Sequence, residues 1–171
     1  MATTNLPEWW LRGPVPGVPA LLQSVAHALL QAKDEVGFLM RDFPENLLWE
    51  KPAGAASAGF HVQHLRGVLD RLFTYADGQM LSEEQLKQLR QEGTPPDEST
   101  TKQRLLNAFQ QQVDRSVEIL KMTDENSLTL SRGVGRSQLP STVIGLFFHA
   151  AEHTMRHTGQ LLVTVRVLYS Q

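Results

Sequence analysis

The feature that most restricts the fold is the spacing of apolar residues, which recur every three or four positions through four long segments. These segments span about 19–43, 57–76, 100–122 and 141–169. Such spacing places the apolar side chains on one face of an α-helix. A helix with one apolar face buries it against other helices. We therefore predict an all-α protein built as a four-helix bundle.

Shorter features connect the four segments. Residues 82–85 (SEEQ) have the form of a capping box, which predicts a short extra helix between the second and third long helices, ending before Gly93. Residues 44–56 contain two prolines and a glycine, and residues 123–140 are polar with two glycines, so both stretches are predicted to be loops. No stretch shows the alternation that predicts a β-strand.

The chain is predicted to form one domain at 18–171, preceded by an irregular N-terminal arm at 1–17. The arm contains three prolines and two glycines, which disfavour a regular helix. Its two tryptophans, Trp9 and Trp10, are predicted to dock on the body of the domain. A chain of 171 residues is long enough to bury a core without disulfides or other staples.

Composition excludes several classes of site and partner. The chain has no cysteine, which excludes disulfides, thiolate metal sites and a cysteine nucleophile. Its formal net charge is -2 and it has no basic stripe, so no nucleic-acid partner is expected. No signal peptide is visible and charged residues or histidines interrupt the apolar stretches. A soluble, cytoplasmic protein without a membrane partner is therefore expected.

Five of the six histidines fall into two clusters. His149, His153 and His157 follow one another at four-residue steps in the fourth long segment, and His61 and His64 lie in the second. A step of four residues turns a helix by only about 40°, so the three imidazoles of the fourth segment project from one side. Neutral imidazole is the commonest metal ligand in proteins. The two clusters together predict a metal site between two helices.

The position of each histidine relative to the apolar stripe separates the candidates. His153 and His157 lie within the stripe of the fourth segment, whereas His149 lies at its edge, about 80° away. Two imidazoles one turn apart in such a stripe are costly unless each has a partner, and a shared cation supplies one. In the second segment, His61 falls on the apolar face and His64 near its boundary. The third ligand stays open between His61 and His64, with His149 in reserve.

Two further residues of the fourth segment are candidates for catalysis. Glu152 flanks the stripe and could act as a base or support a ligand, although a solvated carboxylate is the simpler interpretation. Gln160, one turn after His157, could hydrogen-bond a ligand or a water molecule, or serve packing. No other carboxylate or general base stands out near the histidine clusters.

Two stretches resemble a known family. Residues 61–78 (HVQHLRGVLDRLFTYADG) and 149–162 (HAAEHTMRHTGQLL) are similar to the DinB/YfiT-like superfamily of metal-dependent hydrolases. The second stretch resembles the His-x-x-x-His-Arg-Gly-Gln pattern of that family, with Thr158 in place of the arginine. The order of the helices and the long connection between the second and third agree with the family over about 18–169.

The resemblance implies a four-helix bundle with one divalent cation, nickel or zinc, held by three histidines. The family's ligand from the second helix matches His64, and its ligands from the fourth helix match His153 and His157. His61 remains the reserve candidate for the ligand from the second helix. Family members are often homodimers. Their better-understood relatives are transferases or isomerases that use a low-molecular-weight thiol.

A site of three neutral histidines leaves at least one metal position open, which is typical of catalytic sites. An open position can hold a water molecule of lowered pKa or a thiol that the metal deprotonates. We therefore expect a metal-dependent hydrolase or thiol S-transferase that acts on a small molecule. One alternative is a non-catalytic stress-response bundle that binds a metal or small ligand. Another is a bundle whose histidines are hydrogen-bonded within the core.

Overall fold

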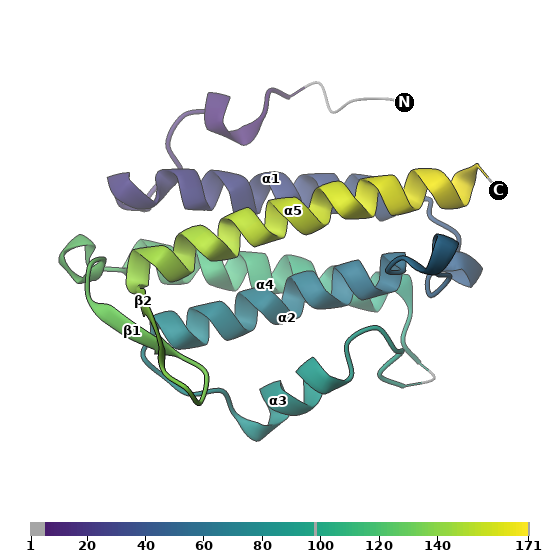
Figure 1. Cartoon of the computed structure of the whole chain (residues 1–171). Helices are drawn as coiled ribbons and strands as arrows, with labels where there is room; N and C mark the ends of the chain where they lie inside the picture. The colour runs from purple at the N-terminus through teal and green to yellow at the C-terminus, as the bar shows by residue number, and fades with distance from the viewer. Residues whose placement is uncertain (1–5, 98, 171) are drawn as a thin grey trace.

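The computed structural model describes residues 6–97 and 99–170, and it is mostly helical (Figure 1). The α-helices are α1 (Gln23–Met40), α2 (Ala58–Ala76), α3 (Glu83–Arg90), α4 (Lys102–Met122) and α5 (Val143–Tyr169). Two strands, β1 (Ser131–Val134) and β2 (Leu139–Thr142), form a small sheet between α4 and α5. Single 3-10 turns lie at Trp9–Leu11, Ala20–Leu22, Glu45–Leu47, Pro52–Gly54 and Glu125–Ser127. The prediction of a helical protein is confirmed.

Side-chain caps define where most of the helices begin. Four helices start after a Ser or Thr whose hydroxyl accepts a backbone N–H of the first turn: Ser57, Ser82, Thr101 and Thr142. Such a cap satisfies a donor that the helix itself leaves unpaired. At Ser82, the backbone N–H also donates to the side chain of Gln85, 2.9 Å away, which completes the predicted capping box. The predicted short helix between the second and third long helices is therefore present as α3.

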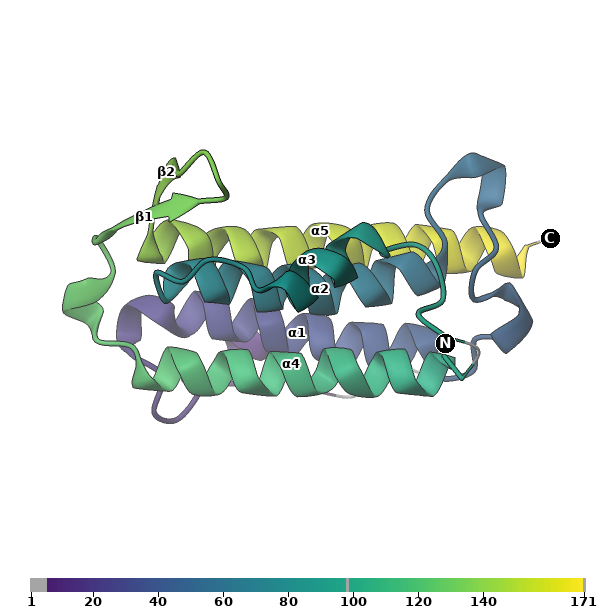
Figure 2. The ribbon, with the colours of Figure 1, turned by 90° about the horizontal axis from the view of Figure 1, so that it is seen from below.

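The four long helices lie side by side, and each contacts two others. α1 packs against α4 and α5, and α2 also packs against α4 and α5. The contact between α2 and α5 is the most extensive of these, and these two helices carry the histidine clusters. α3 lies on the outside of α2, as the two views of the ribbon show (Figures 1 and 2). In the described part of the chain, no helix combines the length and apolar character that crossing a membrane requires.

All four long helices supply side chains to one hydrophobic core. The fully buried residues include Leu29 and Val36 of α1, Leu65 and Leu69 of α2, Phe109 and Val113 of α4, and Ala150 and Leu161 of α5. The two residues from each helix lie 4, 7 or 11 positions apart, which is the spacing of one helical face that the periodicity of the sequence predicts. Burial of these stripes is the main favourable contribution to folding.

The hairpin corrects the prediction that residues 123–140 form a loop and that the chain has no strand. β1 and β2 pair antiparallel, with Ser131 opposite Thr142, and a glycine stands opposite a proline within the pair. Both strands are short and none of their residues is buried. They therefore lack the alternation of apolar and polar residues by which a strand is detected in a sequence. Backbone pairing rather than side-chain burial forms this hairpin.

The described part of the N-terminal arm packs along α1 through one of its two tryptophans. The indole N–H of Trp9 donates to Asp34 over 2.8 Å, and its ring packs against the core. Trp10 is 64% exposed, so the prediction that it also docks on the body is wrong. The start of the arm at 1–5 lies outside the described residues, and the division into an arm and one domain stays a prediction.

Removal of a core aromatic side chain should destabilise the protein strongly. Phe109 on α4 is completely buried, so Phe109→Ala should lower the free energy of unfolding by about 3–5 kcal/mol, through lost burial and the remaining cavity. Met122 ends the same helix but is 78% exposed, so Met122→Ala should change stability by about 0.5 kcal/mol or less. Denaturant unfolding of both variants measures the difference. Equal stabilities would contradict the assignment of the inward face of α4.

Candidate metal centre

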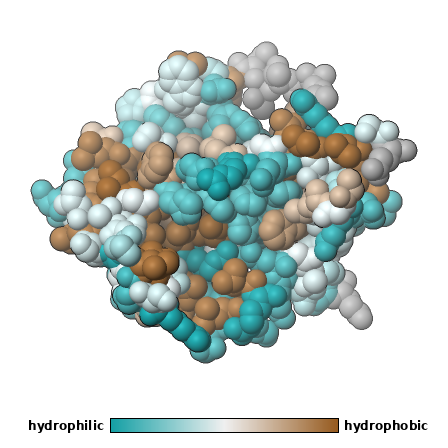
Figure 3. Space-filling model, viewed as in Figure 1, coloured by the Kyte–Doolittle hydropathy of each residue, from teal (hydrophilic) through white to brown (hydrophobic). Residues whose placement is uncertain are grey.

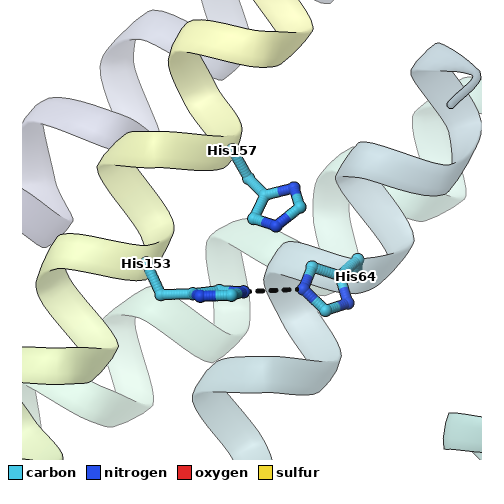
Figure 4. A group of neighbouring side chains, drawn as sticks. All are labelled: His64, His153 and His157. Carbon is cyan, nitrogen blue, oxygen red and sulfur yellow. Dashed lines mark hydrogen bonds between the residues drawn. The ribbon is translucent and has the colours of Figure 1, made fainter. Parts of the chain in front are cut away.

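Three histidines converge in the contact between α2 and α5 (Figure 4). His64 comes from α2, and His153 and His157 come from successive turns of α5. Each offers one ring nitrogen, and these nitrogens all lie within 4.8 Å of one another. The Nε2 atoms of His64 and His153 are 2.9 Å apart (Figure 4). This group could hold a metal ion.

The distance between the nitrogens of His64 and His153 fits two ligands of one cation. Zinc binds imidazole nitrogen at about 2.0–2.1 Å, so two such ligands lie about 2.9 Å apart at a right angle and about 3.3 Å apart at the tetrahedral angle. The 2.9 Å between the Nε2 atoms of His64 and His153 falls at the short end of this range. Imidazole nitrogen suits zinc, nickel, copper and iron. The donor set therefore fits a divalent transition metal.

The site favours neutral imidazoles, which are the form that binds a metal. Burial is the main cause that lowers the pKa of His157 to about 4, and repulsion from His64 and His153 lowers it further. The pKa of His153 is also lowered, first by burial and then by its neighbours His64 and His149. Both rings therefore keep a free lone pair at neutral pH, and proton competition for these nitrogens is weak.

His61 lies beside the group rather than in it. Its ring is 3% exposed, and its Nδ1 lies 3.2 Å from Nδ1 of His157. Burial first, and then repulsion from His64, lower the pKa of His61 to about 4. One of the two facing Nδ1 atoms must carry a proton to donate, and the other accepts. The helical wheel placed His61 on the apolar face and left the third ligand open, and the ring that reaches His153 is that of His64.

The other sequence candidates lie at the edge of the site. His149 is exposed, and its Nδ1 is 3.6 Å from a carboxylate oxygen of Glu152. Oε1 of Glu152 accepts a hydrogen bond of 2.9 Å from Nε of Arg156, which forms an ion pair within α5. Gln160 is also exposed, and it lines a cleft that reaches His61. The catalytic roles considered for Glu152 and Gln160 stay predictions.

A carboxylate that the sequence did not single out contacts the group directly. Glu92, just after α3, lies with Oε2 2.6 Å from Nδ1 of His64. Its other oxygen accepts a hydrogen bond of 2.6 Å from Arg71. Burial alone would raise the pKa of Glu92, but the hydrogen bonds from His64 and Arg71 outweigh it and hold the pKa below its usual range. The structure therefore adds to the histidine group a carboxylate that the sequence did not indicate.

The three rings differ in how their second nitrogen is held. His64 has Glu92 at Nδ1, and His157 has His61 at Nδ1. The Nδ1 of His153 is buried and has no hydrogen-bond partner among the described residues. Two of the three candidate ligands are thus oriented by a polar neighbour, and the third is oriented by packing.

These features define a helical protein with a three-histidine group that could hold a metal ion. The family model of the DinB superfamily matches residues 28–161, a range that includes all three histidines. The chain therefore belongs to the DinB superfamily, and the resemblance in its sequence is confirmed. No curated protein matches the chain.

The lowered pKa of His61 predicts how the stability of the metal-free protein depends on pH. Between pH 6.5 and about 4, the unfolded chain binds a proton at His61 that the folded chain does not bind. Stability therefore falls as the pH drops through this window. The His61→Asn variant cannot bind this proton in either state. Its free energy of unfolding should therefore fall less steeply as the pH drops, by up to about 1.4 kcal/mol per pH unit.

Denaturant unfolding in the presence of a chelator, repeated from pH 7.5 to pH 4, measures both slopes. A parent and a His61→Asn variant with the same slope would show that His61 is protonated in the folded protein as easily as in the unfolded chain.

Proposed function

We propose that His64, His153 and His157 hold one divalent cation within a DinB-type four-helix bundle. The observation that carries this proposal is the convergence of one nitrogen from each ring within 4.8 Å, from two helices that pack closely. The 2.9 Å between Nε2 of His64 and Nε2 of His153 and the lowered pKa of His157 both support it. Nickel or zinc suits a site of three imidazoles.

On this proposal, the protein is a metal-dependent enzyme of the hydrolase or thiol S-transferase type. A cation held by three imidazoles would keep an open position, where it lowers the pKa of a water molecule or of a low-molecular-weight thiol. The chain's own contribution is to present neutral rings in a fixed arrangement. The chain has no cysteine, so a thiol would have to come as a cosubstrate.

A surface cleft next to the site supports a small-molecule substrate. The cleft has a volume of about 570 Å³ and is lined by His61, Arg156, Gln160 and Val163, among others. This size is typical of pockets for small molecules. Arg156 and Gln160 offer hydrogen-bond donors to a polar substrate, and His61 connects the cleft to His157.

The alternative is a non-catalytic bundle in which the metal or a small ligand serves stability or a stress response. The three-histidine site suits this alternative as well, because the carboxylate of Glu152 is paired with Arg156 rather than with one of the three histidines. Thiol-dependent turnover by the metal-loaded protein separates the two functions. Retention of the metal without turnover of thiol or hydrolysable substrates would favour the alternative.

A cytoplasmic homodimer stays a prediction. Large exposed apolar side chains that would support a dimer lie on α5, where Phe148 is 65% and Val163 61% exposed, rather than along α1. The space-filling view shows hydrophobic patches between hydrophilic ones on one face of the molecule (Figure 3). Sedimentation of the purified protein measures the oligomeric state.

Elemental analysis of the purified, untagged protein tests the metal site. After loading with zinc or nickel and removal of the excess, we expect about one equivalent in the parent. The double variant His153→Ala/His157→Ala should retain almost none, because a single remaining imidazole holds a divalent ion poorly. His27→Asn is the matched control, since His27 lies on α1 and contacts the carbonyl of Gly13.

A parent that retains no metal after loading would contradict the proposal. Equal retention by the parent and the double variant would also contradict it, because the ion would then lie elsewhere.

A further inference from the structure

Glu92 and His64 form a close contact between a loop and the candidate metal centre. Nδ1 of His64 lies 2.6 Å from Oε2 of Glu92, and Nε2 of the same ring points to Nε2 of His153 at 2.9 Å. The carboxylate is an acceptor, so Nδ1 of His64 must be the nitrogen that carries the proton. In the neutral ring, Nε2 then keeps its lone pair, and this lone pair faces the other two histidines.

A second contact fixes the carboxylate itself. Oε1 of Glu92 accepts a hydrogen bond of 2.6 Å from Arg71, which lies about two helical turns beyond His64 on α2. The side chains of Glu92 and Arg71 are only 9% and 10% exposed. A buried carboxylate is stable when both oxygens are paired. Glu92 therefore has one oxygen committed to Arg71 and the other to His64.

A glycine in the middle of α2 makes room for this pair. A Cβ atom at Gly67 would lie 2.6 Å from both Nη1 of Arg71 and Oε1 of Glu92, so a side chain there would force these two groups to shift. Glycine inside a helix costs about 0.5–1 kcal/mol relative to alanine, so its presence here needs a packing reason. The contact between Arg71 and Glu92 supplies that reason.

The segment that carries Glu92 is held to α2 mainly by polar contacts. The N–H of Gly93 donates to the side chain of Gln63 over 2.8 Å, and Gln63 neighbours His64 on α2. Gly93 has a φ of 91°, a left-handed conformation that glycine adopts easily. The side chain of Gln85 on α3 donates to Asp70 over 2.9 Å. No residue of α3 is buried, so this helix positions the segment with Glu92 without contributing to the hydrophobic core.

We propose that Glu92 is a positioning residue of the metal centre, which accepts the Nδ1 proton of His64 and so presents Nε2 to the cation. The inference rests on the proposed metal site and deepens it. Arg71 fixes the carboxylate, and Gly67 leaves the space for both. Histidine ligands of metals commonly donate their other ring N–H to a carboxylate, which sets the tautomer and the ring orientation.

The first test is Glu92→Gln, with Glu83→Gln as the matched control. An amide has one acceptor oxygen, so its NH₂ group would face a donor of either His64 or Arg71. The zinc affinity of Glu92→Gln, measured by competition with a chromophoric chelator, should fall about 10- to 100-fold. Glu83 lies exposed at the start of α3, so Glu83→Gln removes the same charge and should leave the affinity unchanged.

A second variant covers the case in which Glu92→Gln does not fold. Gly67→Ala adds one methyl group where the Arg71–Glu92 pair lies, and alanine favours the helix. It should therefore lower the zinc affinity while the far-ultraviolet circular dichroism of the helices remains. If Glu92 only stabilised the fold, these variants would be less stable, but the folded protein would keep the same zinc affinity.

The tautomer of His64 provides a readout that needs no variant. Nitrogen-15 NMR of the parent at pH 8, with and without zinc, should show the proton of His64 on Nδ1 in both states. A proton on Nε2 in the metal-free protein, or zinc bound to Nδ1, would overturn the inference. Unchanged zinc affinity in Glu92→Gln would overturn it as well, while the parent's metal site stands. A parent that binds no zinc would overturn both the metal site and the role of Glu92.

Discussion

The close packing of α2 against α5 is the constraint on which the candidate site depends. The apolar stripes of the two helices bury residues such as Leu65 and Leu161, and the histidines lie in the same contact. The helices thus bring together imidazoles that would otherwise stay apart in water. Burial keeps His153 and His157 neutral, and neutral rings are metal ligands. The packing that stabilises the fold therefore also prepares the nitrogens for a cation.

His64 and His157 have different neighbours. On the α3 side, Glu92 and Arg71 form a buried, charged pair that reaches His64. At His157, the neighbour is His61, which also lines a cleft that opens to solvent. The loop after α3 therefore contacts His64, whereas the surface cleft is connected to His157 through His61.

The periodicity of apolar residues was sufficient to predict the long helices, but it could not predict the hairpin or all residues of the site. The long helices and the capping box at Ser82 were predictable, because each follows from local spacing. The hairpin was missed, since its short, poorly buried strands have no apolar alternation. The wheel could not choose between His61 and His64, because both lie near the same face of α2. Glu92 was missed because it reaches His64 from a loop 28 residues further along the chain.

Anomalous diffraction from crystals of the protein loaded with zinc or nickel tests the central claim most directly. We predict one strong anomalous peak between α2 and α5, within bonding distance of Nε2 of His64, His153 and His157. A peak at His61 or His149 instead, or no peak between these helices in a fully loaded crystal, would contradict it.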